Sequence, residues 1–335
     1  MEFKHFIGID VSKATLDITV VSAAKPLLHQ QISNTTKDIR TIIPKLLKTF
    51  RATLEDTLFC MEYTGIYNLF LLKWLPSQGA KVWLESGVQI ARSTGVTRGK
   101  NDKVDSYRIA MYAYTNRHQA RLWKAPKPIL GKLSALLSQR SRLIKAKRQL
   151  TTALKEQSLF LEKQIIRTLQ KNTDKVVTVL KQQIKVIEKE IHDTIKQDEN
   201  LDRLNKIITS IDGVGFVTAA YVIITTNEFT SITDAKKYAC YAGVVPFEHT
   251  SGTSYKTKAR VSHRANKTVK KLLHLSALAA LKKKGELYEY YQRKVAEGKN
   301  KMSVLNAIRN KLVLRIFSCV KQNRAFEKKY SYSLV

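Results

Sequence analysis

The chain has 335 residues, which is enough for two or three domains with hydrophobic cores of ordinary size. Its 59 Lys and Arg outnumber its 27 Asp and Glu and leave a formal net charge of +32, which predicts a polyanionic partner, nucleic acid ahead of a membrane surface. The sequence argues against export, a membrane span, a disulfide framework and a cysteine-rich zinc site, because it has no leader pattern, no long apolar run and no CxxC pair. We therefore expect the protein in a reducing cytoplasm.

The first part of the chain predicts strands and helices in alternation. Runs of β-branched and apolar residues closed by polar residues or glycine are typical of buried strands. The expected elements are strands at 5–10 and 16–22 joined as a hairpin, a strand at 57–65, a helix at 67–79 and a strand at 80–86. This order predicts an α/β domain, which we assign to residues 1–125.

The middle of the chain predicts long helices. Between Gly131 and Gly213 there is neither a glycine nor a proline to break a helix. Mostly apolar residues recur three and four positions apart over 143–161 and 177–191, as in helices that pack side by side. We predict a long antiparallel coiled-coil arm at residues 126–200, with its bend at 171–175, suited to spacing or oligomerisation.

The last part, residues 201–335, predicts a mostly helical domain. Its stretch SIDGVGFVTAAYVI has the glycine spacing of a helix-hairpin-helix. In that motif Gly213 and Gly215 would permit a tight turn, and the next helix would offer free N–H groups to a DNA phosphate. The alternative is an ordinary turn between helices. Residues 251–324 hold 19 Lys and Arg against three Glu. The resulting net charge of +16 is half of the +32 of the whole chain.

Four carboxylates stand where a divalent metal site is expected. Asp10 and Glu62 end predicted strands, and Asp102 and Asp105 begin a predicted helix, where a spacing of three places both on one face. Strand ends and a helix start can converge in an RNase H-like fold, and oxygen ligands favour Mg²⁺ or Mn²⁺ over zinc. Two such ions stabilise the attacking and leaving oxygens of phosphoryl transfer. A helix cap explains any one acid as well, but the constellation favours metal.

Basic residues near these acids and in the C-terminal part are candidates for nucleic-acid binding. Beside the acids they are Lys13, Arg98 and Lys100, for which a solvated basic loop is the alternative. In the C-terminal part they are Lys256, Lys258, Arg260, Arg264, Lys267 and Lys270.

The polar stretch HTSGTSYKTKARVSHR combines hydroxyl groups with cations. A serine that attacks a phosphodiester needs cations to stabilise the charge that builds on the phosphoryl oxygens. Without a family, Ser and Thr before Gly are more often a polar turn. The pattern alone does not choose Ser251 over Thr250, Thr253 or Ser254.

The motifs and their order resemble a known family. GIDVSKATLD, MEYTGIY and GKNDKVDSYRIA are followed by SIDGVG, YAGVVPFEHTSGTS and ARVSHRANK. Together they resemble the DEDD-type serine transposases of the insertion-sequence 110 family, in its 1111-like branch. The resemblance covers nearly the whole chain.

The resemblance implies a RuvC-like N-terminal domain, a coiled-coil connector and a C-terminal transposase domain. Its catalytic serine falls on Ser251, and its acidic tetrad falls on Asp10, Glu62, Asp102 and Asp105. Proteins like this are guided by a structured noncoding RNA, the bridge RNA, which pairs with donor and target DNA. They act in the bacterial cytoplasm as homotetramers, dimers of dimers in which the acids of one subunit meet the serine of another. Strand exchange passes through a covalent phosphoserine and a Holliday junction.

The sequence therefore predicts an RNA-guided, Mg²⁺- or Mn²⁺-dependent DNA recombinase, and two alternatives stay open. A RuvC-type junction-resolving nuclease would use metal-activated water, would need Ser251 only as a turn residue, and would leave no covalent protein–DNA adduct. A non-catalytic nucleic-acid scaffold would respond to Mg²⁺ only as ionic strength. The gathered acids argue against the scaffold, since a polyanion binder gains nothing from them.

Overall fold

The structure is a computed structural model that describes residues 3–93, 102–251, 255–261 and 265–327. At residues 248–251 and 255–260 it describes the backbone alone. The chain divides into two compact units, Met1–Ala125 and Pro126–Val335. Within the described ranges no helix is both long enough and apolar enough to span a bilayer.

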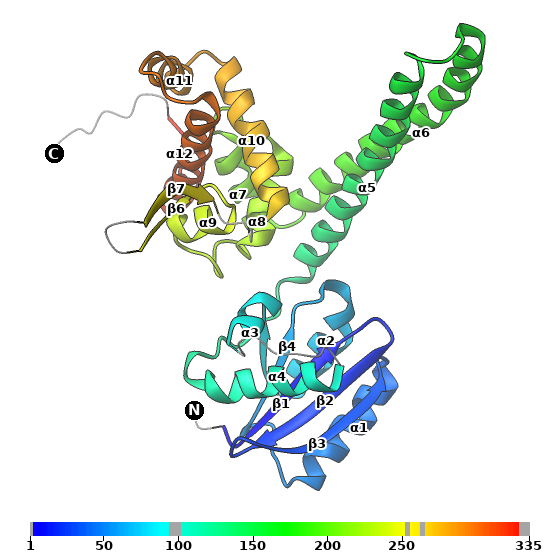
Figure 1. The fold of residues 1–335 in the computed structure, drawn as a ribbon, viewed down its shortest axis with the longest axis vertical. Coiled ribbons are helices and arrows are strands. Elements are labelled where there is room, and N and C mark those ends of the chain that lie inside the picture. Colours follow the sequence, from blue (N-terminus) through cyan, green and yellow to red (C-terminus); the bar gives the residue numbers. More distant parts are fainter. Residues whose placement is uncertain (1–2, 94–101, 252–254, 262–264, 328–335) are drawn as a thin grey trace, which may run out of the picture. The chain divides into compact units, whose positions relative to one another are not determined.

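The N-terminal unit is built on a mixed sheet of five strands in the order β3-β2-β1-β4-β5 (Figure 1). Strands β1, β2 and β3 pair antiparallel, whereas β4 is parallel to both β1 and β5. The strands are β1 (His5–Val11), β2 (Thr15–Ser22), β3 (Lys25–Ser33), β4 (Thr57–Glu62) and β5 (Lys81–Glu85). The predicted α/β unit is confirmed, and its strand order is consistent with an RNase H-like fold.

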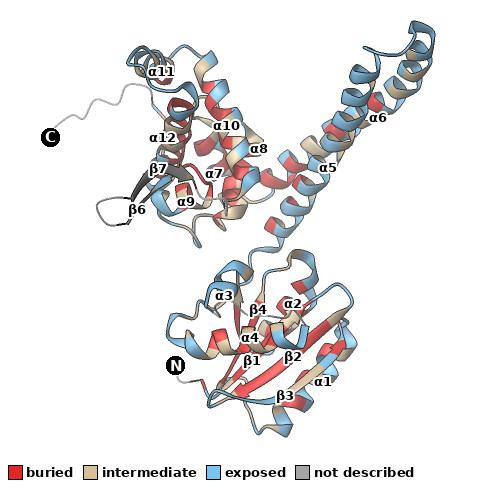
Figure 2. Ribbon diagram, viewed as in Figure 1, coloured by how far each residue is buried: buried red, intermediate tan, exposed pale blue. Residues whose placement is uncertain are grey.

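Helices cover both faces of this sheet, which is why the central strands are apolar on both sides (Figure 2). One core joins the sheet to α1 (Thr36–Thr49) and α2 (Leu69–Ser77). The other joins it to α3 (Gly87–Ser93) and α4 (Asp102–Thr115). Short 3₁₀ turns lie at Gly65–Asn68 and Arg117–Gln119. Strand β3 and helix α1 were not predicted from the sequence.

The second unit begins with two long helices, α5 (Pro128–Gln157) and α6 (Lys163–Lys196), which run side by side in opposite directions (Figure 1). Arg140 on α5 pairs with Glu188 on α6 at 2.7 Å between Nη2 and Oε1. The prediction of a bend at 171–175 is wrong, because α6 passes through these residues and the chain turns at 158–162 instead. The inward face of α6 already includes Ile166 and Leu169, in helical register with Val177, so nothing interrupts the helix at 171–175.

The rest of the second unit is a helical domain around one large core, with a two-stranded hairpin of β6 (Pro246–Ser251) and β7 (Tyr255–Val261). Its helices are α7 (Glu199–Thr209), α8 (Phe216–Thr225), α9 (Ala235–Tyr241), α10 (Lys267–Lys282), α11 (Glu286–Ala296) and α12 (Lys301–Lys321). Gly213 lies in the α7–α8 turn at φ +86°, and a Cβ there would overlap the α10 backbone at Ser276 and Ala280. Close packing therefore requires this glycine, whereas Gly215 is exposed and caps α8.

Candidate active site

A row of carboxylates crosses one face of the N-terminal sheet. The antiparallel register places Asp10 on β1 opposite Asp17 on β2. Strand β1 pairs with β4 in parallel up to Ile9 and Met61, so the next residues, Asp10 and Glu62, lie side by side. Glu62 pairs in turn with Glu85 on β5. Since residues in register on neighbouring strands point to the same side, four acids share one face of the sheet.

Helix α4 adds two more acids to the centre of this row. Asp102 and Asp105 lie in its first turn. The helix rests directly on β1, because a Cβ on Gly8 would overlap the Ser106 carbonyl oxygen and the Ala110 nitrogen. Thr19 and Ser106 share a buried hydrogen bond of 2.8 Å between their hydroxyl oxygens. This close packing brings carboxylate oxygens of Asp10, Asp102 and Asp105 within 4.8 Å of one another.

The negative charge at the centre of the row is not balanced by the described part of the chain. Burial, followed by the nearby charges of Asp102 and Asp105 and then of Asp17 and Glu62, raises the pKa of Asp10 to about 6. Among the described residues no Lys, Arg or His pairs with Asp10 or Glu62. Asp105 pairs with Arg108 at 2.8 Å. Arg108 therefore offsets the charge of Asp105, and the repulsion at Asp10 remains.

The acids at the two ends of the row have protein partners. Asp17, which is 4% exposed, accepts hydrogen bonds of 3.0 Å from the side chains of His29 and Gln31 on β3. Glu85 accepts a 3.2 Å bond from the Tyr112 hydroxyl, and burial together with this carboxylate raises the pKa of Tyr112 to about 12. Asp10 and Glu62 therefore differ from the outer acids in having no described side-chain donor, whereas Asp105 has only Arg108.

These residues fit a divalent metal ion. Asp10, Asp102 and Asp105 offer hard oxygen ligands in one place, and a divalent cation would relieve the repulsion that raises the pKa of Asp10. Glu62 is not among the three acids grouped within 4.8 Å, although it lies next to Asp10 in the sheet. Its carboxylate rests against Gly87, where a Cβ would overlap it. Gly87 therefore leaves room for the fourth acid, a role that the sequence analysis missed.

The predicted nucleophile belongs to the other unit. Ser251 is the last residue of β6, and its backbone is in register with Tyr255 on β7. Its side chain lies outside what the structure describes. Thr250 shares that status, while Thr253 and Ser254 lie outside the described residues altogether.

The predicted nucleic-acid contacts are spread over both units. Lys13 is exposed in the β1–β2 turn, Lys267 is exposed at the start of α10, and Lys270 is half-buried one turn later. Only the backbone of β7 is described at Lys256, Lys258 and Arg260. Arg98, Lys100 and Arg264 lie outside the described residues.

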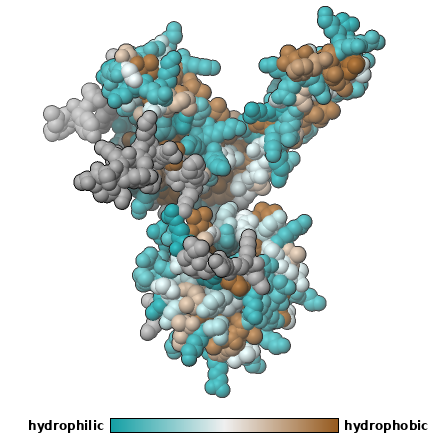
Figure 3. Space-filling view, viewed as in Figure 1, coloured by the Kyte–Doolittle hydropathy of each residue, from teal (hydrophilic) through white to brown (hydrophobic). Residues whose placement is uncertain are grey.

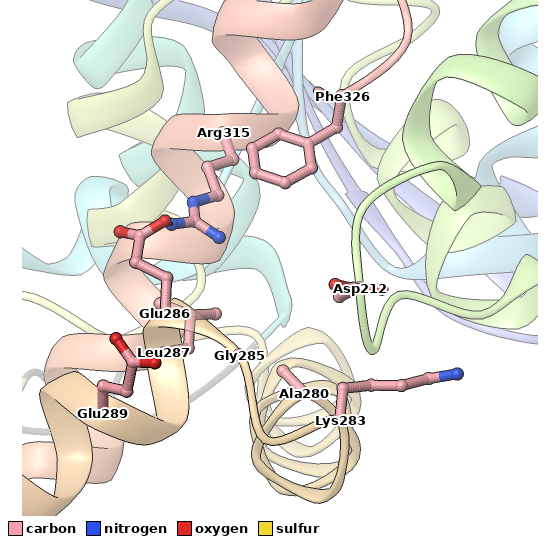
Figure 4. Close-up of a pocket in the computed structure, with 9 residues that line it drawn as sticks. All are labelled: Asp212, Ala280, Lys283, Gly285, Glu286, Leu287, Glu289, Arg315 and Phe326. Carbon is pink, nitrogen blue, oxygen red and sulfur yellow. Dashed lines mark hydrogen bonds and ion pairs between the residues drawn. The ribbon is translucent and has the colours of Figure 1, made fainter. Parts of the chain in front are cut away.

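A pocket of about 240 Å³ lies in the C-terminal unit, between the α7–α8 turn, the start of α11 and the side of α12 (Figure 4). Arg315 lines it, pairs with Glu286 at 2.6 Å and lies over the ring of Phe326 at 4.8 Å. Asp212 and Glu289 add negative charge to the lining. Lys283 also lines the pocket, but three acids line it and Arg315 is already paired, so this pocket does not suit a polyanion.

The chain is similar to transposases along most of its length. A family profile described as "Transposase" matches residues 7–162, and one described as "Transposase IS116/IS110/IS902 family" matches residues 205–292. The "Pilin gene-inverting protein" of Moraxella bovis is 26% identical over 97% of this chain and 98% of its own length. The "Insertion element IS116 uncharacterized 44.8 kDa protein" of Streptomyces clavuligerus is 22% identical over 96% of each chain.

Among solved structures, "T. thermophilus RuvC in complex with Holliday junction substrate" aligns with 36% of this chain and 99% of its own, at 13% identity and a TM-score of 0.30. The two profiles match in the same order along the chain, one on the carboxylate-bearing unit and one on the helical domain. The full-length similarity to the Moraxella protein joins them. The chain thus belongs to the IS110/IS116 family of transposases.

Proposed function

We propose that this transposase is an RNA-guided DNA recombinase that cuts and rejoins donor and target DNA. The observation that carries the proposal is the group of Asp10, Asp102 and Asp105, in which Arg108 pairs with Asp105 but no described cation pairs with Asp10, in a chain of net charge +32. Such a group suits chemistry on a phosphodiester and is of no use for simply holding a polyanion. The guide, a bridge RNA, is proposed from the family resemblance.

In this proposal the N-terminal unit supplies the metal ligands and the C-terminal unit supplies the nucleophile. Asp10, Glu62, Asp102 and Asp105 would hold Mg²⁺ or Mn²⁺, which when bound supplies Lewis-acid stabilisation of the phosphoryl oxygens. The Ser251 hydroxyl loses its proton and its Oγ bonds to phosphorus, while one bridging P–O bond breaks and its oxygen leaves as a hydroxyl. Attack by the hydroxyl of another strand on the phosphoserine restores the serine and completes the exchange.

Self-association, as a homotetramer, is part of the proposal. The distal half of the α5–α6 pair exposes apolar side chains, and Figure 3 shows them gathered toward the far end of the arm. They include Leu159, Phe160, Val176 and Val179, which are exposed by 50% to 86%. Apolar side chains exposed together on one element are typical of protein–protein contacts, and they support a second copy of the chain as the partner.

The test looks for a covalent protein–DNA adduct. Wild-type protein, Mg²⁺, the RNA encoded beside the gene and end-labelled DNA spanning the end of the element are incubated and resolved on denaturing gels. We expect a labelled adduct that disappears in Ser251→Ala and persists in Ser254→Ala, a matched hydroxyl control three residues away. Cleavage that survives Ser251→Ala without an adduct would instead establish a hydrolytic junction nuclease of RuvC type. Binding without cleavage, indifferent to Mg²⁺ at constant ionic strength, would establish the scaffold.

A further inference from the structure

One arginine of the C-terminal unit is buried without a counter-charge. Arg309 on α12 is 6% exposed, and its Nε has no hydrogen-bond partner. Among the described residues no carboxylate pairs with it, and burial lowers its pKa. A guanidinium removed from water is costly unless an anion and good hydrogen bonds compensate it. The fold therefore keeps a charge that its described part does not satisfy.

The groups around Arg309 are basic or neutral. Its Nη2 donates to Nδ1 of His274 at 2.7 Å, so that His274 is neutral with its proton on Nε2. Its Nη1 donates to the Asn306 side chain at 3.4 Å. Lys270 lies one helical turn before His274 on α10, and burial followed by the charge of Arg309 lowers the pKa of both residues. The three side chains are thus close enough for the charge of Arg309 to act on the other two, and no described carboxylate pairs with Arg309.

This cluster sits where the chain enters the β6–β7 hairpin. Helices α10 and α12 pack side by side (Figure 1). The Asn306 amide donates to the Val244 carbonyl at 2.7 Å, which ties α12 to the segment just before β6. Gly243 has φ +65°, and the Lys270 Cδ lies 3.6 Å from where a Cβ would stand on it. Lys270 and His274 are half-buried and Arg309 is buried, so solvent reaches the first two side chains more than the third.

We propose that Lys270, His274 and Arg309 form a binding site for a phosphodiester group of nucleic acid, beside the strand that carries Ser251. A phosphate oxygen is the acceptor that an unpaired guanidinium Nε and an ammonium group both match. Arg315 offers the contrast within the same unit, because Glu286 already neutralises it. The site extends the proposed function to a second point of contact with the DNA backbone, and it needs neither metal nor Ser251 to bind.

The first measurement is thermal unfolding, followed by circular dichroism at 222 nm, with inorganic phosphate as the probe against chloride at equal ionic strength. The variants are Arg309→Met, Lys270→Gln and the matched control Lys271→Gln, an exposed lysine on the same helix. We expect phosphate to raise Tm in wild type and Lys271→Gln, less in Lys270→Gln, and not in Arg309→Met. Without phosphate, Arg309→Met should melt no lower than wild type, because it removes an unpaired buried charge.

A second measurement keeps the proposal testable if Arg309→Met fails to fold. Fluorescence anisotropy with a labelled DNA duplex, without RNA or divalent metal, should show Lys270→Gln binding about tenfold more weakly, with a salt slope smaller by about one, while Lys271→Gln matches wild type. Equal losses in Lys270→Gln and Lys271→Gln, or a phosphate response that survives in Arg309→Met, would overturn the site. Because neither assay involves cleavage, a failure of the serine or metal chemistry leaves both readouts intact.

Discussion

The two units hold unpaired charge of opposite sign. Residues 1–125 carry 18 Lys and Arg against 10 Asp and Glu, yet their sheet gathers acids at its centre without pairing Asp10 to a described cation. Residues 126–335 carry 41 Lys and Arg against 17 Asp and Glu, and there it is Arg309 that is buried without a carboxylate. Folding alone favours pairing both kinds of charge. The two proposals explain this difference: a cation would complete the first unit, and a phosphate would complete the second.

Within the carboxylate row, the acids at the ends differ from Asp10 in their hydrogen-bond partners. Asp17 and Glu85, at its two ends, are held by His29, Gln31 and Tyr112. Asp10 lies between them without such donors. The outer acids are therefore held by hydrogen bonds within the unit, whereas Asp10 has no described donor and is available to a ligand.

The largest effect is expected where a proposed metal ligand is removed. Asp105→Asn should lower strand cleavage at least about 100-fold, because even residues behind a metal ligand commonly cost 10- to 100-fold. Binding of guide RNA and DNA should be retained. Cleavage rates measured over a Mn²⁺ titration, together with anisotropy for binding, check both statements.

Glu85→Gln is the matched control for this substitution, since it also removes one charge from the acidic neighbourhood. Its carboxylate already has donors in Tyr112 and the Ser86 backbone, so we expect less than about a tenfold change in rate. Full cleavage by Asp105→Asn, or equal losses in both variants, would remove the distinction between central and outer acids.

A smaller effect is expected from disturbing the packing that brings α4 to β1. Gly8→Ala forces α4 away from the strand, which should lower the free energy of unfolding by about 1–3 kcal/mol and weaken stabilisation by Mn²⁺. Trp74, Trp83 and Trp123 are the only tryptophans of the chain, so urea unfolding followed by tryptophan fluorescence reports this unit alone.

Gly131→Ala in α5 supplies the control for this glycine. Its Cβ would meet nothing within 4 Å, so the change should be neutral or stabilise the helix by up to about 1 kcal/mol, as seen by circular dichroism. A Gly8→Ala variant as stable as wild type and as responsive to Mn²⁺ would show that close contact at this residue is not what positions Asp102 and Asp105.

Much of the acidic site could be predicted from the sequence, because strand ends and helix starts leave local signals. Asp10 follows a β-branched run, and Asp102 and Asp105 open a helix after a polar stretch. The partners of Asp17 could not be found in the same way. His29 and Gln31 lie on β3, an edge strand with mixed polarity that was not predicted, and their role depends on register across three strands.

The wrong prediction of a bend at 171–175 and the unpredicted lack of a partner for Arg309 have different reasons. The polar run at 171–175 resembles a turn, but α6 keeps an apolar face from Ile166 to Val177 and the helix continues. Arg309 did have a signal, because it lies on the same stripe of α12 as Leu305, Leu312 and Ile316. A cation on an apolar face indicates burial, whereas the absence of a partner becomes visible only when the neighbouring helices are packed.

The smallest expected effect concerns the pH dependence of the metal-free N-terminal unit. Asp10 has a pKa of about 6 in the folded chain and an ordinary value of 3.8. Between these pH values the folded state binds more protons than the unfolded state, so stability falls as pH rises from about 4 to about 6. We expect a loss of about 1–2 kcal/mol after allowance for solvent screening, measured by urea unfolding with tryptophan fluorescence in chelator.

Asp10→Asn should flatten this pH dependence and make the metal-free unit more stable at pH 7 than wild type, because it removes a charge that burial and four other acids oppose. Saturating Mn²⁺ should reverse the order at pH 7, stabilising wild type and leaving Asp10→Asn nearly unchanged. A variant that is less stable without metal would mean that the carboxylate of Asp10 is satisfied within the chain. Asp10 would then differ from the outer acids in position but not in being unsatisfied, and the case for a metal ion bound at Asp10 would be lost.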